Sequence, residues 1–529
     1  MKLVRTELQN HCARRREYRL IGACALLAAV LGSTGRAHAG TCEELAHLLL
    51  PHTTITSTTV VPAGAFSAPI PAPPGMPPPS FGALPAFCRV SATSRPSADS
   101  EIRFEVWLPA AHWNGKLQGV GNGGLGGGIS YGALGEALAH GYVTASTDTG
   151  HTGTFATAEW ALGHPEKVID FGHRAVHEMT MQAKAILRAF YGAPARHSYW
   201  NGCSEGGHQG LSEAQRYPQD YDGILAGAPA NFFTHLQMGG NWISQSVHRE
   251  PASFVPAAKM ALVHRAVLKA CDALDGVKDG VLEDPRRCAI DLKALQCHGA
   301  DSDQCLTAPQ IAGLEKVYGG ARSPDTGAQV FPGYMPGGEL DWPLWIVGTD
   351  VPARNLQHLI QDAFFKYVVF ENPEWQWQSF DFGKDVVFTD RKLASVLNAT
   401  DADLGAFKAS RGKLVQYHGW SDAAISPLNS VNYFKSVQAK MGDTSGFYRL
   451  FMVPGMSHCA GGEGTDVFDK VGTLERWVEE GIAPEQIIAS RSVSGKVTRT
   501  RPLCPYGKVA RWKGSGDTDD ASNFTCVAD

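Results

Sequence analysis

The amino-acid sequence predicts an α/β fold in which a large lid domain is inserted into a domain with a mostly parallel central sheet. Strand-like segments alternate with helix-like segments in the first half of the chain, and the alternation resumes after residue 404. Between these parts, residues 232–403 show no steady alternation and are rich in aromatic residues and loops. Alternating strands and helices favour a parallel sheet covered on both faces. We therefore expect residues 85–231 and 404–529 to form one domain, with residues 232–403 as the lid.

The expected elements follow from hydrophobic periodicity. Residues 102–108 alternate between apolar and polar side chains, which is typical of a strand with one buried face. Residues 176–190 carry apolar side chains at helical spacing. Short apolar runs bounded by turns or polar clusters predict further strands at residues 117–120, 142–146, 414–418 and 448–453.

The first 84 residues contain two segments of unusual composition. Four arginines between positions 14 and 19 precede an apolar run over residues 20–31, and Ala37-His38-Ala39 offers a small-residue cleavage site. This pattern predicts a signal peptide over residues 1–39 and a secreted or periplasmic protein without a membrane anchor after cleavage. Residues 40–84 are polar and Pro-rich, and we expect an extended segment that wraps the surface outside the core.

Charge and cysteine content narrow the class of protein further. The 529 residues have a formal net charge of −5, so the composition shows no basic excess and nucleic acid is not an expected partner. Of the 12 cysteines, Cys12 and Cys24 lie in the expected signal peptide, which leaves ten. An even number of cysteines in an exported chain predicts disulfides, although some buried free thiols remain an alternative. The sequence alone does not determine how they pair.

Two Gly-x-Ser-x-Gly patterns occur in the chain, and their surroundings distinguish them. Ser204, in Gly202-Cys203-Ser204-Glu205-Gly206, stands between a strand-like segment at residues 198–200 and a helix-like segment at residues 207–216. An esterase nucleophile needs this strand–turn–helix setting. Ser130 follows a glycine-rich loop and lacks it. Ser204 is therefore predicted to be the nucleophile of an α/β-hydrolase that cleaves carboxylic esters.

The glycine-rich loop at residues 121–128 has a predicted role of its own. It follows the strand expected at residues 117–120, where hydrolases of this class place an oxyanion donor. The backbone N–H groups of Gly124 and Glu205 are expected to stabilise the tetrahedral oxyanion, by about 3 kcal/mol each. A phosphate-binding loop is the weaker interpretation, because no acidic ribose partner follows at the required spacing.

Two downstream segments supply the expected acid and base. Asp422 ends His418-Gly419-Trp420-Ser421-Asp422, which follows a strand-like segment, and His458 follows the next one. This gives the chain order Ser, Asp, His that such hydrolases use. His458 is predicted to be the general base and Asp422 to orient it. His418 is the competing base, but its place so close to Asp422 favours a role in lining the substrate pocket.

Cysteines flank both the predicted nucleophile and the predicted base. Cys203 precedes Ser204, and Cys459 follows His458. If the serine and the histidine are in contact, these two cysteines lie within bridging distance. A disulfide between them would join the two loops.

Taken together, these segments resemble the tannase and feruloyl esterase family, which includes mono(2-hydroxyethyl) terephthalate hydrolase. The similarity extends in order over nearly the whole mature chain, and the combination of Cys-Ser, Asp and His-Cys is specific to the family. The matching segments are Trp113-Asn114-Gly115-Lys116, residues 201–229, Cys271-Asp272-Ala273-Leu274-Asp275-Gly276, residues 418–424, residues 453–459 and Arg501-Pro502-Leu503-Cys504-Pro505-Tyr506.

The resemblance implies a set of site residues in addition to the fold. Ser204, Asp422 and His458 match the family's triad, Gly124 and Glu205 match its oxyanion positions, and Cys203–Cys459 matches its active-site disulfide. The other implied disulfides are Cys42–Cys88, Cys271–Cys288, Cys297–Cys305 and Cys504–Cys526.

The resemblance also implies a structural calcium ion in the lid. Residues 272–281 match the family's calcium site, in which side-chain and main-chain oxygens provide the hard ligands that Ca²⁺ prefers. From the residues alone, a solvated acidic turn is an equal alternative. No organic cofactor is expected. The implied ligands are the carboxylates of Asp272, Asp275 and Asp279 and the backbone carbonyls of Val277 and Val281.

The expected substrate is an ester of a feruloyl- or cinnamoyl-type acid, as a small molecule or linked to a polysaccharide. A tannase that acts on galloyl esters is the alternative within the family. Terephthalate monoesters fit less well, because Ile425 stands where that subgroup carries Phe and no lid Arg matches the one that binds the substrate carboxylate. Outside the enzymes, the alternative is a catalytically silent binding protein on the same scaffold. The oligomeric state is not predicted.

Overall fold

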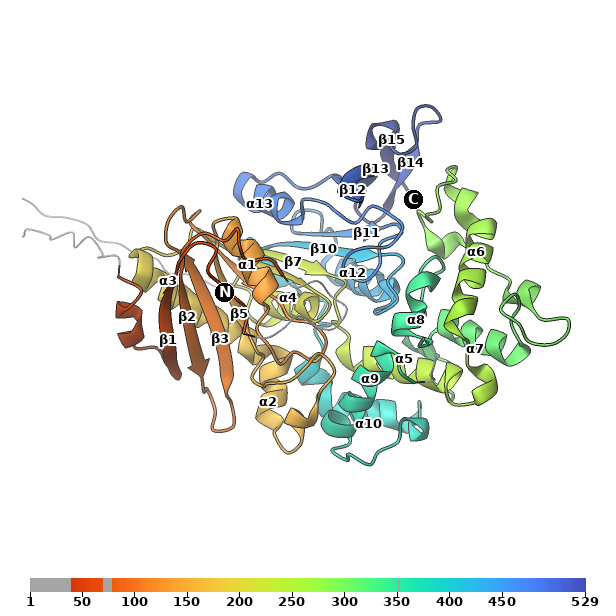
Figure 1. Cartoon of the computed structure of the whole chain (residues 1–529), viewed down its shortest axis with the longest axis horizontal. Coiled ribbons are helices and arrows are strands. Elements are labelled where there is room, and N and C mark those ends of the chain that lie inside the picture. The colour runs from red at the N-terminus through yellow and green to blue at the C-terminus, as the bar shows by residue number, and fades with distance from the viewer. Residues whose placement is uncertain (1–39, 70–78, 350–352) are drawn as a thin grey trace, which may run out of the picture. The chain divides into compact units, whose positions relative to one another are not determined.

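A computed structural model describes residues 40–69, 79–349 and 353–529 (Figure 1). The expected signal peptide, residues 1–39, lies outside the described residues. No helix among the described residues is long and apolar enough to cross a membrane.

The described residues contain a sheet of nine strands in the order β1-β2-β3-β5-β4-β6-β7-β10-β11. The strands from β5 to β11 in this order are mutually parallel, and β1, β2, β3 and β5 pair antiparallel. The mostly parallel sheet and all the strands expected from periodicity are thus confirmed. The strands are β1 (Thr53–Val61), β2 (Phe87–Ser94), β3 (Ile102–Pro109), β4 (Lys116–Val120), β5 (Val143–Thr147), β6 (His197–Cys203), β7 (Gly223–Gly227), β10 (Lys413–Gly419) and β11 (Tyr448–Val453).

Helices cover both faces of this sheet, as the alternation predicts. Apolar side chains of α3, α4, α11 and α12 pack with one set of strand residues, and those of α1 and α13 pack with the other set. The expected helices at residues 176–190 and 207–216 correspond to α3 and α4. The helices are α1 (Tyr131–Ala139), α2 (Pro165–Ile169), α3 (Ala175–Tyr191), α4 (Glu205–Arg216), α11 (Gly405–Ala409), α12 (Pro427–Met441) and α13 (Lys470–Glu480).

The described residues of 232–403, the segment expected to be the lid, are mainly helical, and their apolar side chains form two clusters together with residues of the sheet domain. The aromatic side chains of Phe364 and Phe365 are buried there, so this stretch serves the lid core. Figure 1 shows these helices gathered together, in green to teal. The lid elements are α5 (Phe233–Val247), α6 (Met260–Cys271), α7 (Ala308–Gly319), α8 (Trp342–Trp345), α9 (Leu356–Ala363) and α10 (Lys384–Leu397), with the short strands β8 (Ala321–Arg322) and β9 (Gln329–Phe331).

The segment from residue 40 to 84 differs from the expected wrapping segment outside the core. Residues Thr53–Val61 form the edge strand β1, and Leu45, Phe66 and Phe81 are buried. The strand consists of Thr, Ser, Val and Ile, and β-branched side chains favour strands even where polarity hides the alternation. The segment is therefore part of the sheet and of its core.

The described residues contain five disulfides, with the pairings that the family resemblance implies. They link Cys42–Cys88, Cys203–Cys459, Cys271–Cys288, Cys297–Cys305 and Cys504–Cys526. The last one joins the C-terminal hairpins, which consist of β12 (Ile487–Val493) with β13 (Lys496–Leu503) and β14 (Lys508–Trp512) with β15 (Phe524–Ala528).

Candidate active site

Ser204 occupies the sharp turn between β6 and α4. Its backbone angles are φ 64° and ψ −120°, a conformation that a residue with a side chain rarely adopts. A Cβ atom at Gly202 would lie 2.3 Å from the carbonyl oxygen of Gly206, so only glycine permits the turn. The Ser204 N–H donates to the Gly227 carbonyl at 3.0 Å, which holds the turn against β7. The strand–turn–helix setting predicted around Ser204 is therefore present.

Asp422 and His458 are brought together by the loops that follow β10 and β11. The His458 Nδ1 donates to the Asp422 Oδ2 at 2.8 Å. The other carboxylate oxygen, Oδ1, accepts hydrogen bonds from the backbone N–H groups of Ala424 and Ile425, both at 2.8 Å. Asp422 thus holds the imidazole with Nδ1 protonated, which leaves Nε2 free to accept a proton.

The environment of Asp422 keeps its carboxylate ionised. Burial alone raises the pKa of Asp422, but the charge of His458 and hydrogen bonds from His418 and His458 outweigh burial. The net result is a pKa well below the ordinary value. A fully buried carboxylate is therefore available to stabilise a positive charge on His458.

His418 does not line the substrate pocket, which corrects the sequence-based expectation. Its side chain is fully buried beside Asp422, with Nε2 3.2 Å from the Asp422 Oδ2. The Nδ1 atom lies 2.7 Å from the Ser430 hydroxyl, and Nε2 lies 3.1 Å from the Ile425 carbonyl. Both ring nitrogens of His418 have polar partners in the protein interior, so the imidazole is fixed beside the Asp422 carboxylate.

Ser204 and His458 line the same pocket. Among the described residues, the Ser204 hydroxyl makes no hydrogen bond, so it is free to approach a substrate. Trp345 of the lid packs against His458, with the ring centroids 5.3 Å apart. The other lining residues are Gly124, Phe155, Glu205, Ala230, Phe233, Leu236, Gln237, Gly240, Gln357, Ile360, Ala424 and Ile425.

The walls of this pocket are mostly apolar, and α5 provides one of them. Phe233, Leu236, Gln237 and Gly240 recur at helical spacing and therefore share one face. Gln237 is only 5% exposed, and among the described residues its amide has no hydrogen-bond partner. Sequence reasoning missed Gln237, because a single Gln in a lid helix carries no pattern. Ile425, expected in the pocket, does line it.

The Cys203–Cys459 disulfide joins the turn of Ser204 to the loop of His458. Its Cα atoms are 6.0 Å apart, although the two residues are separated by 256 positions in the sequence. Each cysteine is adjacent to one of the two side chains that face the pocket. The bridge therefore limits how far the serine and the histidine can separate.

The glycine-rich loop lies against the turn of Ser204. The Gly206 N–H donates to the Asn122 carbonyl at 2.9 Å, and Gly124 has φ 58°. A Cβ atom at Gly124 would lie 2.2 Å from the Phe155 carbonyl oxygen, so the position requires glycine. Within the described residues, the N–H groups of Gly124 and Glu205 donate no hydrogen bond, and both residues line the pocket. Two free donors are thus available beside Ser204.

Ser130 is engaged elsewhere. It precedes α1, and its hydroxyl donates to the Gly121 carbonyl at 2.7 Å. The structure thus gives this second Gly-x-Ser-x-Gly serine a role in holding the glycine-rich loop.

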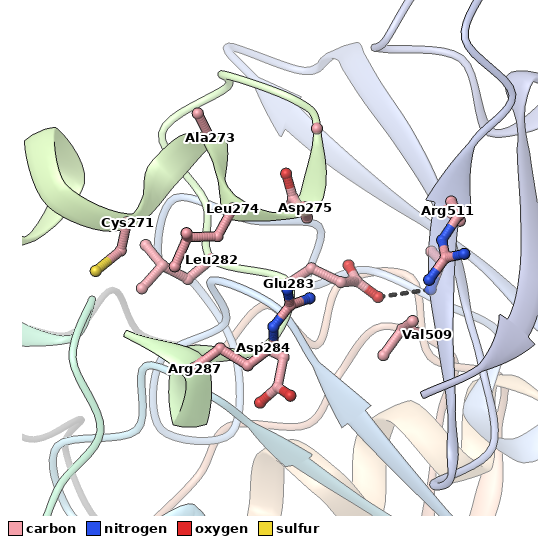
Figure 2. Close-up of a pocket in the computed structure, with 12 residues that line it drawn as sticks. Cys271, Ala273, Leu274, Asp275, Leu282, Glu283, Asp284, Arg287, Val509 and Arg511 are labelled. Atoms are coloured by element: carbon pink, nitrogen blue, oxygen red, sulfur yellow. Dashed lines mark hydrogen bonds between the residues drawn. The ribbon is translucent and has the colours of Figure 1, made fainter. Parts of the chain in front are cut away.

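The acidic turn of the lid lies against the C-terminal hairpin. Figure 2 shows Asp275 and Glu283 facing Val509 and Arg511 across a pocket, with the Ala510 N–H donating to the Glu283 Oε1 at 2.7 Å. Asp275, Val277, Asp279, Val281 and Glu283 line a second, smaller pocket. Four of these five are ligands expected from the sequence, and Glu283 is an additional oxygen donor that sequence reasoning missed.

The oxygens of this turn suit a hard cation, but several of them are engaged within the protein. The Asp272 Oδ1 accepts hydrogen bonds from the N–H groups of Asp279 and Gly280 at 3.2 and 3.0 Å. Asp279 forms an ion pair with Arg501. Burial raises the pKa of Asp275, and the carboxylates of Asp279 and Asp272 add to this effect. Among the described residues, no three side-chain ligand atoms of this turn all lie within 4.8 Å of one another.

Comparisons with known proteins agree with this geometry. The family model "Tannase and feruloyl esterase" matches residues 88–527. An uncharacterized esterase of Xanthomonas campestris pv. campestris is 39% identical, and the match covers 92% of this chain and 91% of that protein. The mono(2-hydroxyethyl) terephthalate hydrolase of Piscinibacter sakaiensis is 35% identical, with 85% and 86% covered.

A solved structure shows the same fold. The crystal structure of feruloyl esterase B from Aspergillus oryzae superposes with a TM-score of 0.84 at 31% sequence identity, and covers 92% of this chain and 99% of that one. The family model extends over the sheet from β2 onward and over residues 232–403. The chain therefore belongs to the tannase and feruloyl esterase family and is a carboxylic-ester hydrolase.

Proposed function

We propose that the chain hydrolyses its ester through an acyl-enzyme on Ser204. The observation that carries this proposal is the hydrogen bond of 2.8 Å between His458 and Asp422, beside a pocket that Ser204 and His458 both line. His458 removes the proton of the Ser204 hydroxyl as its oxygen attacks the ester carbonyl. The histidine then gives this proton to the leaving alcohol. A water molecule, activated in the same way, releases the acid and restores Ser204.

The N–H groups of Gly124 and Glu205 stabilise the oxyanion in this mechanism. Both are free donors within the described residues, and both belong to residues that line the pocket. Glu205 contributes its backbone only, because its buried carboxylate is paired with His208 at 2.9 Å. Each donor is worth about 3 kcal/mol in sites of this kind.

Replacement of Ser204 tests the mechanism. S204A is expected to lower kcat by at least about 10⁴-fold, because no other hydroxyl is free at the turn. Steady-state rates with a chromogenic ester measure this loss, and pre-steady-state kinetics with the ester in excess should reveal a burst of released alcohol in the parent protein if deacylation is the slower step. S130A is the matched control and should lose far less activity than S204A, because Ser130 only supports the glycine-rich loop through its hydrogen bond to Gly121. Full activity in S204A would refute the acyl-enzyme on this residue.

The pocket supports a neutral aromatic acyl group as substrate. Phe233, Phe155 and Trp345 provide apolar and aromatic surface, and none of the described lining residues is Lys or Arg. A terephthalate monoester would bring a carboxylate into this pocket without a cationic partner, which is costly. We therefore place feruloyl or cinnamoyl esters first and galloyl esters second. Rates with methyl ferulate, methyl gallate and mono(2-hydroxyethyl) terephthalate would rank the three, and a preference for the terephthalate ester would contradict this order.

Gln237 supplies the polar contact for a ring hydroxyl in this proposal. Gln237 is only 5% exposed, lines the pocket, and its amide has no hydrogen-bond partner within the described residues. Q237L is expected to lower kcat/KM for methyl ferulate by about tenfold or more, because the bound hydroxyl would lose its partner. Methyl cinnamate, which lacks the hydroxyl, is the internal control and should be affected little. Equal losses for both esters would assign Gln237 to general packing.

We also propose that the acidic turn of the lid binds a structural Ca²⁺. Carboxylates of Asp272, Asp275 and Asp279 with the carbonyls of Val277 and Val281 make an all-oxygen donor set. Bound Ca²⁺ would neutralise the turn and fix the lid against the C-terminal hairpin. Removal of metal with EDTA should lower the melting temperature, and Ca²⁺ alone should restore it in the parent but not in D275N. An unchanged melting temperature and no calcium by mass spectrometry would count against the site.

Five disulfides support export as a further part of the proposed function. Disulfides persist in oxidising compartments and are rare in the cytosol. Together with the sequence of residues 1–39, they favour a secreted or periplasmic enzyme. Fractionation of the cells that produce it, with detection of the processed N-terminus by mass spectrometry, tests this. A full-length chain in the cytosol would contradict it.

A further inference from the structure

A cluster of one histidine and two acidic side chains lies between α3, α4 and the loop before β7. His177 belongs to α3, Glu213 to α4, and Asp220 to the loop. One ligand-type atom from each lies within 4.8 Å of the other two, and the His177 Nδ1 is 2.6 Å from the Asp220 Oδ2. Glu213 is nine residues after Ser204 on α4, roughly 13 Å along the helix. The cluster is therefore separate from the substrate pocket.

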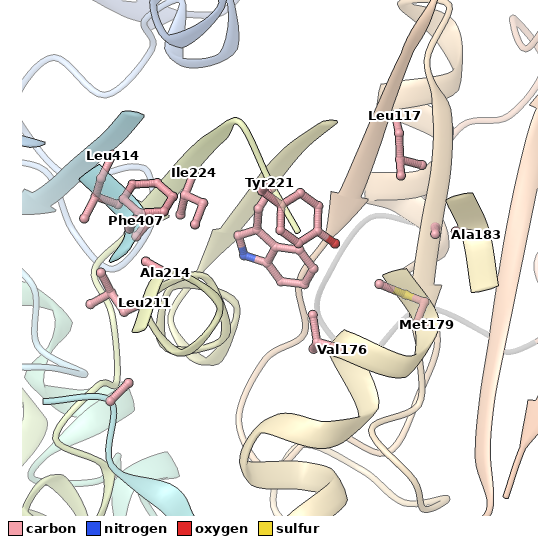
Figure 3. Close-up of a cluster of buried hydrophobic side chains, with 14 of the residues drawn as sticks. Leu117, Val176, Met179, Ala183, Leu211, Ala214, Tyr221, Ile224, Phe407 and Leu414 are labelled. Atoms are coloured by element: carbon pink, nitrogen blue, oxygen red, sulfur yellow. The ribbon is translucent and has the colours of Figure 1, made fainter. Parts of the chain in front are cut away.

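Glu213 gives an independent reason to expect a ligand here. Its residue is only 1% exposed, and within the described residues neither carboxylate oxygen has a hydrogen-bond partner. Its surroundings include the apolar packing of α3 and α4, where Figure 3 shows Tyr221 and Ala214 among buried side chains. A buried carboxylate without a partner is costly, and a second carboxylate beside it increases the cost. The Lys184 ammonium attracts both carboxylates but hydrogen-bonds to neither, so the Glu213 oxygens remain available to a bound cation.

The donor set identifies the kind of ion. One imidazole nitrogen and two carboxylate oxygens suit Zn²⁺ and related transition metals, whereas Ca²⁺ prefers oxygen ligands only. The ion's two positive charges would balance the carboxylates of Glu213 and Asp220. Ligand atoms around zinc lie roughly 3–3.5 Å apart, so the cluster needs only small side-chain adjustments.

The surrounding residues already hold these ligands in place. The His177 ring is stacked on Tyr217, with centroids 3.9 Å apart, which fixes the direction of Nδ1. The Lys184 ammonium donates a hydrogen bond to the Asp220 backbone carbonyl at 2.5 Å, and it acts on the Asp220 carboxylate only through its charge. His177 is partly exposed and provides a route for an ion from solvent. Such fixed outer contacts are typical of metal sites.

We propose that His177, Glu213 and Asp220 form a binding site for a divalent transition-metal ion, with Zn²⁺ as its probe. The rival occupant of the cluster is a proton shared between Glu213 and Asp220. Burial raises the pKa of Glu213 well above its ordinary value, and the charge of Asp220 raises it further. A proton on Glu213 would therefore relieve the repulsion between the two carboxylates, as a bound metal ion would. The two make opposite predictions for E213Q. A glutamine can donate to Asp220 as a protonated glutamate would, but it cannot replace a carboxylate ligand.

The test uses the full-length chain without a histidine tag, stripped of metal and then supplied with excess Ca²⁺ to occupy the lid turn. Calorimetric titration with Zn²⁺ at neutral pH should show one site per chain, and the melting temperature should rise until that site is saturated. E213Q and H177Q should bind Zn²⁺ at least about 100-fold more weakly than the parent. D390N is the matched control, because it disrupts the His235–Asp390 pair in the lid and leaves this cluster intact.

Each outcome decides between the two occupants. Stoichiometric Zn²⁺ in the parent and in D390N, with its loss in E213Q and H177Q, supports the site. If the parent takes up no stoichiometric Zn²⁺, or if E213Q binds it as tightly as the parent, the metal site is refuted. H177Q provides the same comparison should E213Q fail to fold.

Discussion

Asp422 shows how one residue combines burial with a retained charge. Its carboxylate accepts hydrogen bonds from His458 and from two backbone N–H groups, and the Nε2 of the buried His418 lies 3.2 Å from it. Hydrogen bonds donated to both carboxylate oxygens stabilise the ionised form of Asp422. The buried imidazole of His418, beside Asp422, helps to hold this carboxylate in place.

Replacement of Asp422 by Asn tests this arrangement at the residue scale. D422N keeps the size of the side chain but places an amide where the His458 Nδ1 needs an acceptor, which favours the wrong tautomer. We expect kcat to fall by about 10⁴-fold with little change in KM. Steady-state kinetics with a chromogenic ester measures both. S430A, which removes a contact of His418 with Ser430, is the control and should lose less than about tenfold. A D422N enzyme with nearly normal kcat would show that Asp422 does not orient the base.

At the scale of elements, the Cys203–Cys459 disulfide joins the end of β6 to the loop after β11. Its loss should let the Ser204 turn and the His458 loop separate. In the double variant C203A/C459A we expect kcat to fall about 10–100-fold, because small displacements of reacting groups are costly. The double variant C504A/C526A is the matched control. It lacks a different disulfide and should lose stability with little effect on kcat. Equal effects on kcat in the two variants would show that the active-site bridge has no special role in positioning.

Much of the architecture follows from local sequence patterns. The strands and the helices α3 and α4 have clear periodicity, and the strand–turn–helix around Ser204 follows from two glycines that permit a close approach. The strand β1 has no such pattern, because threonines occupy both of its faces at the sheet edge. Its assignment depends on pairing with β2, a contact that the local sequence does not encode.

Within the site, the residues that sequence reasoning missed are those placed by the lid. Gln237 enters the pocket because α5 presents one face to it, and Glu283 joins the acidic turn through a contact with the C-terminal hairpin. The sequence predicts His418 in the pocket, whereas it lies on β10 with its side chain fully buried beside Asp422. In each case a tertiary contact decides the position, and no local motif reports it.

At the scale of the whole molecule, His264 connects the lid to the domain that carries Ser204. It lies on α6, with Nδ1 3.0 Å from Glu339 of the lid and Nε2 2.8 Å from Glu463, which follows the His458 loop. The second contact is an ion pair without hydrogen-bond alignment. Burial lowers the pKa of His264, but hydrogen bonding to Glu339 and the interaction with Glu463 outweigh it and raise the pKa to about 9. The protonated form of His264 therefore stabilises the contact between the lid and the domain that carries Ser204.

The raised pKa gives this contact a defined dependence on pH. Because the folded-state pKa is about 9 and the ordinary value is 6.5, the stabilisation is complete below pH 6.5 and is lost as the pH rises through 9. H264Q should therefore be less stable than the parent at low pH, by up to about 3 kcal/mol, and the gap should narrow as the pH rises through 9. Free energies of unfolding from denaturant titrations across this range measure the gap. H298Q, at an exposed histidine, should show no such trend. If the difference in free energy of unfolding between the parent and H264Q stays constant with pH, His264 is not charged in the contact between the lid and the domain that carries Ser204.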